Sequence, residues 1–337
     1  MNDEIDIIVP WVDNSNPDWQ RQRKYWYEKC HPDQLSDSDI RFQSWDNMQY
    51  WFRAIEKFMP WVNRIFLVTC GHVPDFINTS NPKLRIVRHE EYIPQQYLPT
   101  FNSNVIEMNY HRIPDLSENF IIFNDDLFPL QPIGDEYYFQ DNVVCDEAVE
   151  GHIVPVDTGM ISNMAKYVQA NNMIIINRYF KKREVQERDW DKWYCEDYGE
   201  LLERTKSLAY WYDFAGFRDP HMANAVKKST LSHLWEVEYD ALREMSQNKF
   251  RSYNDVSQYL IRYWQLCAGN FVPRRTQGKF YAVNPDNCEE IVRDIEEQKY
   301  QMISLNENCV GKEFAYIRQR INQAMEMILP EKSGFEK

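Results

Sequence analysis

The segment Phe120–Asp126 runs from four apolar residues into two adjacent carboxylates, a pattern suited to binding a cation. Its Phe-Ile-Ile-Phe portion is typical of a strand that is buried on both faces, as in a parallel sheet. Ligands of such sheets bind beyond the carboxyl ends of the strands, where Asn124, Asp125 and Asp126 would lie. Two negative charges ~4 Å apart repel by about 4 kcal/mol near a protein surface. A divalent cation with oxygen ligands would offset that repulsion. The alternative is a solvated turn, because Asn and Asp also favour turns.

Other residues could handle a phosphoryl group beside such a cation. Asp13 follows the predicted first strand, and His221, Arg251 and Asp255 form a further set with suitable chemistry. Arginine and a metal ion can stabilise phosphoryl charge, and histidine can act as a base. The sequence contains no G-x-G-x-x-G, G-x-x-x-x-G-K, G-x-S-x-G or H-E-x-x-H motif, which disfavours Rossmann dehydrogenases, P-loop enzymes, α/β-hydrolases and zincins.

The composition is that of an ordinary globular protein of 337 residues with a formal charge of −14. This charge disfavours binding to nucleic acid or to an anionic membrane through a general positive field. The seven cysteines are widely spaced and form no Cys-x-x-Cys pair, so neither a disulfide framework nor a structural zinc site is expected. The acidic N-terminus resembles neither a signal peptide nor a membrane span. We therefore expect a cytoplasmic protein.

The elements that must position these residues alternate between strands and helices. The helix Met48–Phe58 is predicted from apolar residues at i, i+3, i+4 and i+7, with Ser44 or Asp46 as its cap. A second helical pattern begins at about Asn104. Short apolar runs predict the strands Asp6–Val9, Ile65–Val68, Leu84–Val87 and Phe120–Asn124. This alternation predicts an α/β domain with a mostly parallel sheet.

The chain divides into four segments on these patterns. Residues 1–145 form the expected α/β core, and 146–212 an insertion with helices. Residues 213–270 complete the site, and 271–337 form a helical C-terminal segment with a packing helix around Phe314–Ile328. The charged, Trp-rich part of the insertion is either a solvated surface or a face that binds the acceptor.

Four blocks of this sequence resemble the conserved regions of the Stealth family of sugar-phosphate transferases. That family includes bacterial capsular polysaccharide phosphotransferases and the catalytic subunit of N-acetylglucosamine-1-phosphotransferase. The blocks are Ile5–Asp13; Trp45–Val62 with Leu98–Ser103, His111–Pro114 and Asn124–Asp126; Asp219–Met222; and Lys249–Ser252 with Asp255. Two positions depart from the family pattern. Asn14 stands where many members have Gly, and Asn104 where many bacterial members have His, so position 104 is a poor candidate for a base.

The resemblance implies a fold like that of glycosyltransferase-A enzymes and a specific reaction. A hydroxyl of a glycan acceptor, lipid-linked at the inner face of the membrane or a longer chain, would attack the β-phosphorus of a UDP-sugar. UMP would leave and a phosphodiester would form. Mg²⁺ or Mn²⁺ would bridge Asp125, Asp126 and the donor diphosphate. His221 would accept the acceptor proton, while Arg251 would hold phosphoryl oxygens.

The remaining candidate residues each have a structural alternative. Asp13 could bind nucleotide or metal, or cap a turn, and Trp11 could stack on the donor or pack in the core. Arg112 could bind phosphate or a surface carboxylate, and Asn102 and Asn124 are candidate substrate contacts. Asp255 could orient His221 or Arg251, or cap a helix. Two rival functions also remain open: a conventional metal-dependent glycosyltransferase releasing UDP, and a non-catalytic glycan-binding protein.

Overall fold

A five-stranded sheet forms the centre of the computed structural model, which describes residues 4–31, 44–155, 160–307 and 311–337. The strand order is β3-β2-β1-β4-β8, where β1 pairs in parallel with both β2 and β4, and β8 is antiparallel to β4. The strands are β1 (Ile5–Pro10), β2 (Ile65–Thr69), β3 (Leu84–Arg88), β4 (Asn119–Ile122) and β8 (Asn224–Lys227). The predicted mostly parallel α/β fold is therefore confirmed.

The apolar runs of the sequence form strands because both of their faces are covered. Every residue of β2 and β4 is buried, as is every residue of β1 except Pro10. The predicted helix at Met48–Phe58 (α2) is also confirmed, and seven of its apolar and aromatic residues face the core. Its predicted cap is wrong. Asn47 is the N-cap residue and makes no side-chain capping bond, while Ser44 bonds Asp46 instead.

Two smaller sheets join distant parts of the chain. One has the order β10-β11-β5, from Lys279–Val283, Met302–Glu307 and Leu127–Pro129; the other has the order β6-β7-β9, from Phe139–Gln140, Val143–Asp146 and Phe271–Pro273. The C-terminal segment thus supplies three strands that the sequence did not predict, besides helices α12 (Cys288–Glu296) and α13 (Gly311–Ile328). Strand β5 begins directly after Asp126, so this segment reaches the candidate site.

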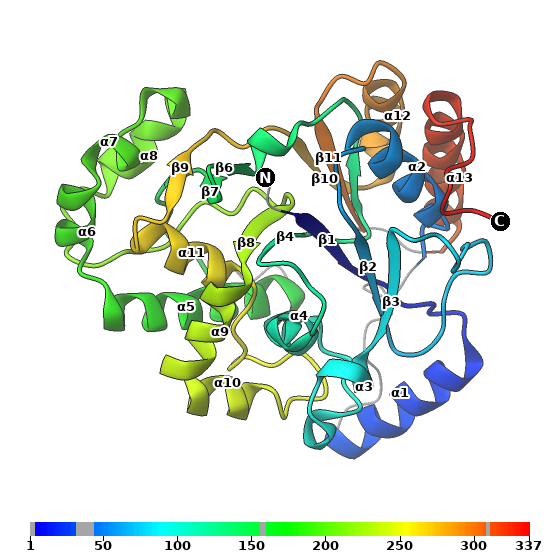
Figure 1. Ribbon diagram of the computed structural model, residues 1–337, viewed down its shortest axis with the longest axis horizontal. Helices are drawn as coiled ribbons and strands as arrows, with labels where there is room; N and C mark the ends of the chain where they lie inside the picture. The colour runs from blue at the N-terminus through cyan, green and yellow to red at the C-terminus, as the bar shows by residue number, and fades with distance from the viewer. Residues whose placement is uncertain (1–3, 32–43, 156–159, 308–310) are drawn as a thin grey trace.

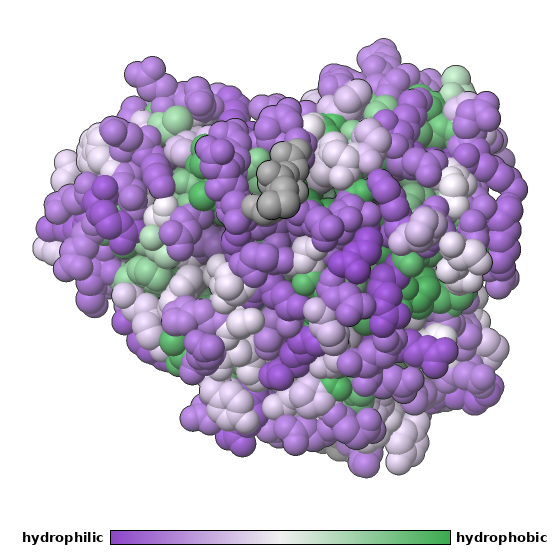
Figure 2. All heavy atoms as spheres, in the orientation of Figure 1, coloured by the Kyte–Doolittle hydropathy of each residue, from purple (hydrophilic) through white to green (hydrophobic). Residues whose placement is uncertain are grey.

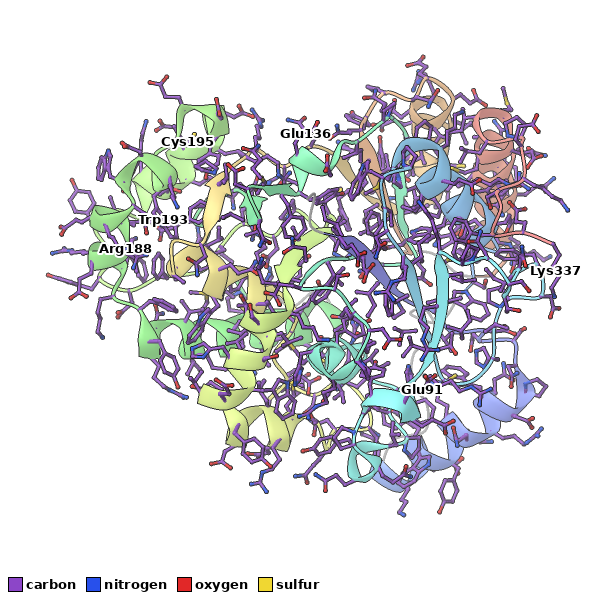
Figure 3. All side chains as sticks on the ribbon, viewed as in Figure 1. Glu91, Glu136, Arg188, Trp193, Cys195 and Lys337 are labelled. Carbon is purple, nitrogen blue, oxygen red and sulfur yellow. The ribbon has the colours of Figure 1, made fainter. Side chains whose placement is uncertain are left out.

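The insertion is helical, as predicted, and lies at one end of the molecule, opposite α12 and α13 (Figure 1). It contains α5 (Met160–Tyr179), α6 (Lys182–Arg188), α7 (Trp190–Trp193) and α8 (Leu202–Ser207). Figure 3 shows Trp193 and Arg188 in this part, well away from β1. Trp193 is fully buried and stacks on Phe214 at 5.3 Å, so the insertion packs against the segment that follows it.

The other helices surround the sheet and bring loops to its edges. They are α1 (Pro17–Cys30), α3 (His89–Tyr92), α4 (Ser103–Met108), α9 (Lys228–Val237), α10 (Tyr239–Met245) and α11 (Tyr259–Cys267). In the part of the chain that the structure describes, no helix is both long and apolar enough to cross a membrane. The face shown in Figure 2 is mostly hydrophilic, with apolar residues in small separate patches.

Candidate active site

The strand order reverses between β1 and β4, which is where open α/β sheets bind their ligands. The chain runs outward from β1 through β2 to β3 and then crosses to β4 on the other side of β1. Because β1 and β4 are parallel, Trp11–Asp13 and Asn124–Asp126 leave the sheet at the same edge. β8 is antiparallel, so the residues just before it, including His221, lie at that edge as well.

A carboxylate and a histidine meet at this edge. His221 Nε2 lies 3.5 Å from Asp126 Oδ2, an ion-pair distance, and has no hydrogen-bond partner among the described residues. Asp126 is 6% exposed, and Ser304 of β11 donates to its Oδ2 at 3.4 Å. Burial lowers the pKa of His221, but the neighbouring Asp126 carboxylate outweighs burial, so the net pKa is raised above its ordinary value. The imidazole is thus held ready to exchange a proton.

A buried ion-pair network holds the loop that carries His221. Asp219, two residues earlier, accepts hydrogen bonds from Tyr263 and from Gln169 of α5. Arg262, 1% exposed, lies 3.4 Å from Asp219 and also donates to both carboxylate oxygens of Asp146. His221 itself has a φ of 53°, in the left-handed region that non-glycine residues rarely occupy. The surrounding contacts therefore hold this residue in an unusual backbone conformation.

Arg251 is the third member of this cluster and lies in the loop between α10 and α11. Its guanidinium donates to Ser103 at 2.6 Å, at the start of α4, and its side chain is otherwise exposed. Its charge is close enough to lower the pKa values of both His221 and Glu107. The structure thus brings together His221, Asp126 and Arg251, three residues that the sequence placed in one site from three separate segments.

Glu107 of α4 is a member of this cluster that the sequence analysis missed. It is buried, and burial raises its pKa to about 7 against the opposing effects of Arg251, His221 and a hydrogen bond with Gln258. A signal was present, since Glu107 is the single charged residue in the otherwise apolar run Val105–Met108. A charged side chain with that setting is seldom buried without a specific purpose.

Neutralising Glu107 should change how the stability of the protein depends on pH. Native wild-type Glu107 stays protonated up to about pH 7, whereas the unfolded chain loses this proton near pH 4.5, so stability falls as the pH rises through that interval. Glu107→Gln stays neutral throughout. We expect the free energy of unfolding of the variant, relative to wild type, to improve by roughly 2 kcal/mol between pH 5 and pH 8. Urea unfolding at both pH values tests this. A constant difference, like that expected for exposed Glu203→Gln, would contradict it.

Asp255 lies behind the cluster and organises it. It is fully buried, and its two oxygens accept hydrogen bonds from the amides of Asn102, Asn104 and Asn248 and from the backbone N–H of Ser252. These bonds join the loop after Arg251 to the start of α4. No contact with His221 or a reacting position is described for Asp255. We therefore assign it a positioning role, while its predicted catalytic role stays a prediction.

Replacing Asp255 should cost stability. Both of its oxygens face only donors, so Asp255→Asn would set its own NH₂ group against one of them. We expect a loss of about 2 kcal/mol in the free energy of unfolding, because a buried donor is left unpaired. The measurement is urea unfolding beside Asp240→Asn, a control whose carboxylate is 91% exposed. Equal stability of the two variants would show that the Asp255 bonds contribute little.

Asn102 and Arg112, two of the predicted substrate contacts, have other partners in the structure. Asn102 is fully buried, caps α4 and bonds Asp255, so the structure places it behind the site rather than at its surface. Arg112 donates to Asn109 and stacks over Trp235 at 4.5 Å, and no described contact links it to the cluster.

Asp13 and Trp11 lie at the edge of the sheet, beyond β1. The side chain of Asp13 accepts hydrogen bonds from the backbone N–H and the hydroxyl of Ser15, so Asp13 caps a turn, which is one of its two predicted roles. The backbone N–H of Asp13 donates to His72. The ring of Trp11 packs edge-on against His72 at 5.5 Å. Asn124 is half-buried after β4, with no described side-chain bond. Their substrate-binding roles stay predictions.

The carboxylate pair has features that suit a cation. Oδ1 of Asp126 is buried without a hydrogen-bond partner among the described residues, so it is an acceptor left free. Asp125 is exposed at the rim, and the surrounding protein and the Asp126 charge together raise its pKa to about 7. Within the described ranges no group of three or more His, Cys, Asp and Glu side chains is placed to hold a metal. Mg²⁺ commonly uses one or two carboxylates and completes its shell with water and substrate phosphates. The pair therefore fits a cation shared with a phosphorylated substrate.

Comparison with known proteins identifies the family. The model for Stealth protein CR2, conserved region 2, matches residues 41–146, which include α4 and the Asp125–Asp126 pair. The chain is 38% identical over 336 residues to the capsular polysaccharide phosphotransferase WcwK of Streptococcus pneumoniae, covering 99% of this chain and 98% of that protein. The chain belongs to the Stealth family.

Two further polysaccharide phosphotransferases match at similar length. An exopolysaccharide phosphotransferase of Lactiplantibacillus plantarum is 34% identical over 99% of this chain and 96% of its own length. The receptor polysaccharide phosphotransferase WefC of Streptococcus oralis is 30% identical over 99% of both chains. Among solved structures, galactosyltransferase LgtC in complex with donor and acceptor sugar analogues aligns over 98% of both chains, with a TM-score of 0.38 and 10% identity.

Proposed function

We propose that this Stealth protein transfers a sugar 1-phosphate from a nucleotide diphosphate sugar, a UDP-sugar, to a hydroxyl of a glycan acceptor. The reaction belongs to the assembly of capsular or other surface polysaccharide. The single observation that carries the proposal is the pairing of His221 with Asp126, beside Arg251, at the ligand-binding edge of the sheet. The full-length similarity to polysaccharide phosphotransferases supports the choice of reaction.

The proposed reaction forms one bond to phosphorus and breaks another. The acceptor oxygen attacks the β-phosphorus of the donor, and the bond from that phosphorus to the oxygen bridging it to the α-phosphate breaks. UMP leaves with the bonding electrons. The bond between the sugar and its phosphate stays intact, so the product is a phosphodiester between the sugar and the acceptor.

Each residue of the cluster has a separate role in this proposed reaction. His221 Nε2, which no described residue engages in a hydrogen bond, takes the proton of the acceptor hydroxyl. The exposed Arg251 guanidinium holds phosphoryl oxygens and stabilises the charge that develops on them. Asp125 and Asp126 would hold Mg²⁺ or Mn²⁺, which would neutralise diphosphate charge when bound. Asp219 and Arg262 keep the His221 loop in place.

The nucleotide product separates this function from its rivals. With a panel of UDP-sugars and glycan acceptors, the proposed function gives UMP, which ion-exchange chromatography resolves from UDP. Release of UDP would identify a conventional glycosyltransferase that breaks the bond to the anomeric carbon. Glycan binding without turnover of any donor would favour the non-catalytic alternative.

A further inference from the structure

Two tyrosine rings are exposed together beside the candidate active site. Tyr167 of α5 and Tyr253 of the loop after Arg251 pack edge-to-face with their centroids 4.9 Å apart. Their side chains are 55% and 47% exposed, although they contact each other. Large aromatic side chains gain most from burial, so an exposed pair is suited to a partner that covers it.

The pair is held on a rigid support. Asn171, one helical turn after Tyr167, donates from its amide to the backbone carbonyls of Tyr253 and Asp255, both at 2.8 Å. The adjacent Asn172 exchanges two hydrogen bonds with Ser257, at 3.0 and 3.1 Å. These bonds fasten the loop to α5, so the two rings keep their arrangement without a ligand. A surface ordered in advance binds with less loss of conformational freedom.

The segments that carry the two tyrosines are also connected to the segments that carry Arg251 and His221. Tyr253 is two residues from Arg251, and the loop between them is held by Asp255. Gln169, two residues after Tyr167, donates to Asp219, which is two residues before His221. Tyr253 therefore lies on the loop that carries Arg251, and Tyr167 lies on the helix that holds the His221 loop through Gln169.

The tyrosine pair and the expected donor position lie on different elements of the fold. The donor diphosphate is proposed to lie between β1 and β4, near Asp13 and the Asp125–Asp126 pair. The tyrosine pair instead belongs to α5 and the loop before α11, and α11 packs on both β8 and α5. A substrate lying on the rings would thus approach His221 from the side that the donor leaves open.

We propose that Tyr167 and Tyr253 form the platform on which the acceptor glycan binds, with its attacking hydroxyl directed to His221. Aromatic rings suit the apolar faces of pyranose rings, while the side-chain oxygen of Asn171 and the amide of Asn254 suit sugar hydroxyls. This inference rests on the proposed function, because only a transferase needs an acceptor there.

Steady-state kinetics, with KM measured separately for the acceptor and for the UDP-sugar, tests the platform. Tyr253→Ala and Tyr167→Ala should each raise the KM for the acceptor by about tenfold, as expected for loss of one aromatic contact. The KM for the UDP-sugar, and the slow release of UMP to water without acceptor, should stay within twofold of wild type. Tyr253→Phe should restore acceptor KM, since the ring is kept. Tyr210→Ala, at a 90% exposed tyrosine after α8, is the matched control and should change nothing.

Direct binding keeps this test separate from the reaction chemistry. Saturation-transfer NMR with a panel of methyl α- and β-hexopyranosides should show binding to the wild type and to Tyr210→Ala, and weaker signals with either platform variant. Release of UDP rather than UMP would overturn the proposed function while leaving this binding result intact. The platform is overturned if both alanine variants keep the wild-type acceptor KM, if donor KM rises equally, or if the wild type binds no glycoside.

Discussion

His221→Ala is expected to fold, to bind donor, and to lose at least ~100-fold in turnover, because a positioned base commonly contributes 10²- to 10⁴-fold. The imidazole is well placed for that task, with Nε2 lacking a hydrogen-bond partner and Asp126 3.5 Å away. Steady-state kinetics from pH 6 to 9, with donor binding measured by calorimetry, is the required measurement.

Two further variants separate proton transfer from backbone effects. His221 has a positive φ, and Asn tolerates that conformation better than most residues. His221→Asn should therefore fold at least as well as His221→Ala. His221→Gln keeps a hydrogen-bonding side chain. Neither amide can accept the proton, so both should be nearly as impaired. Activity of His221→Ala within tenfold of wild type across this pH range would show that the proton leaves by another route.

Asp126→Asn is expected to lower the rate by orders of magnitude while leaving the fold nearly intact. The replacement has the same shape, but it removes the charge that faces His221 and leaves a neutral amide oxygen, a weaker ligand, for the proposed cation. Asp125→Asn should act in the same direction. Chelator should abolish wild-type activity and Mg²⁺ or Mn²⁺ should restore it. Asp286→Asn, an exposed carboxylate in the short helix Pro285–Asn287, is the matched control.

The pH profile gives Asp126→Asn a second readout. Asp126 raises the pKa of His221, while burial and Arg251 lower it. Without the carboxylate, the His221 pKa should fall, so the acid-side loss of the remaining activity should move to lower pH. Wild-type activity in both aspartate variants would show that the pair is a structural turn. If the acid-side loss of activity in Asp126→Asn stays at the wild-type pH, Asp126 does not control the pKa of His221.

Most of the sheet could be predicted because its strands are continuously apolar. Residues of β1, β2 and β4 are buried on both faces, and such runs are readable without tertiary information. The antiparallel β8 was not predicted as a strand of this sheet. Its pairing with β4 is a contact between residues more than 100 positions apart, which local patterns do not encode.

The site residues divide in the same way. Asp126, His221 and Arg251 could be named because their segments match family blocks. Glu107 was missed because the apolar run Val105–Met108 indicates burial but does not show that an arginine and a histidine from distant segments lie nearby. The role of Asp255 could not be settled from sequence, since it depends on which amides of α4 and the Asn248 loop point at it.

The fate of the β-phosphate tests the central claim most directly. A UDP-sugar labelled with ³²P at the β-phosphorus is incubated with the enzyme, the divalent cation and a glycan acceptor, and the label is followed through separation of nucleotides from glycan. We predict that the label enters the glycan and resists phosphatase, as a phosphodiester does, while the released nucleotide is unlabelled UMP. Label recovered in UDP, with unlabelled glycan product, would contradict the account.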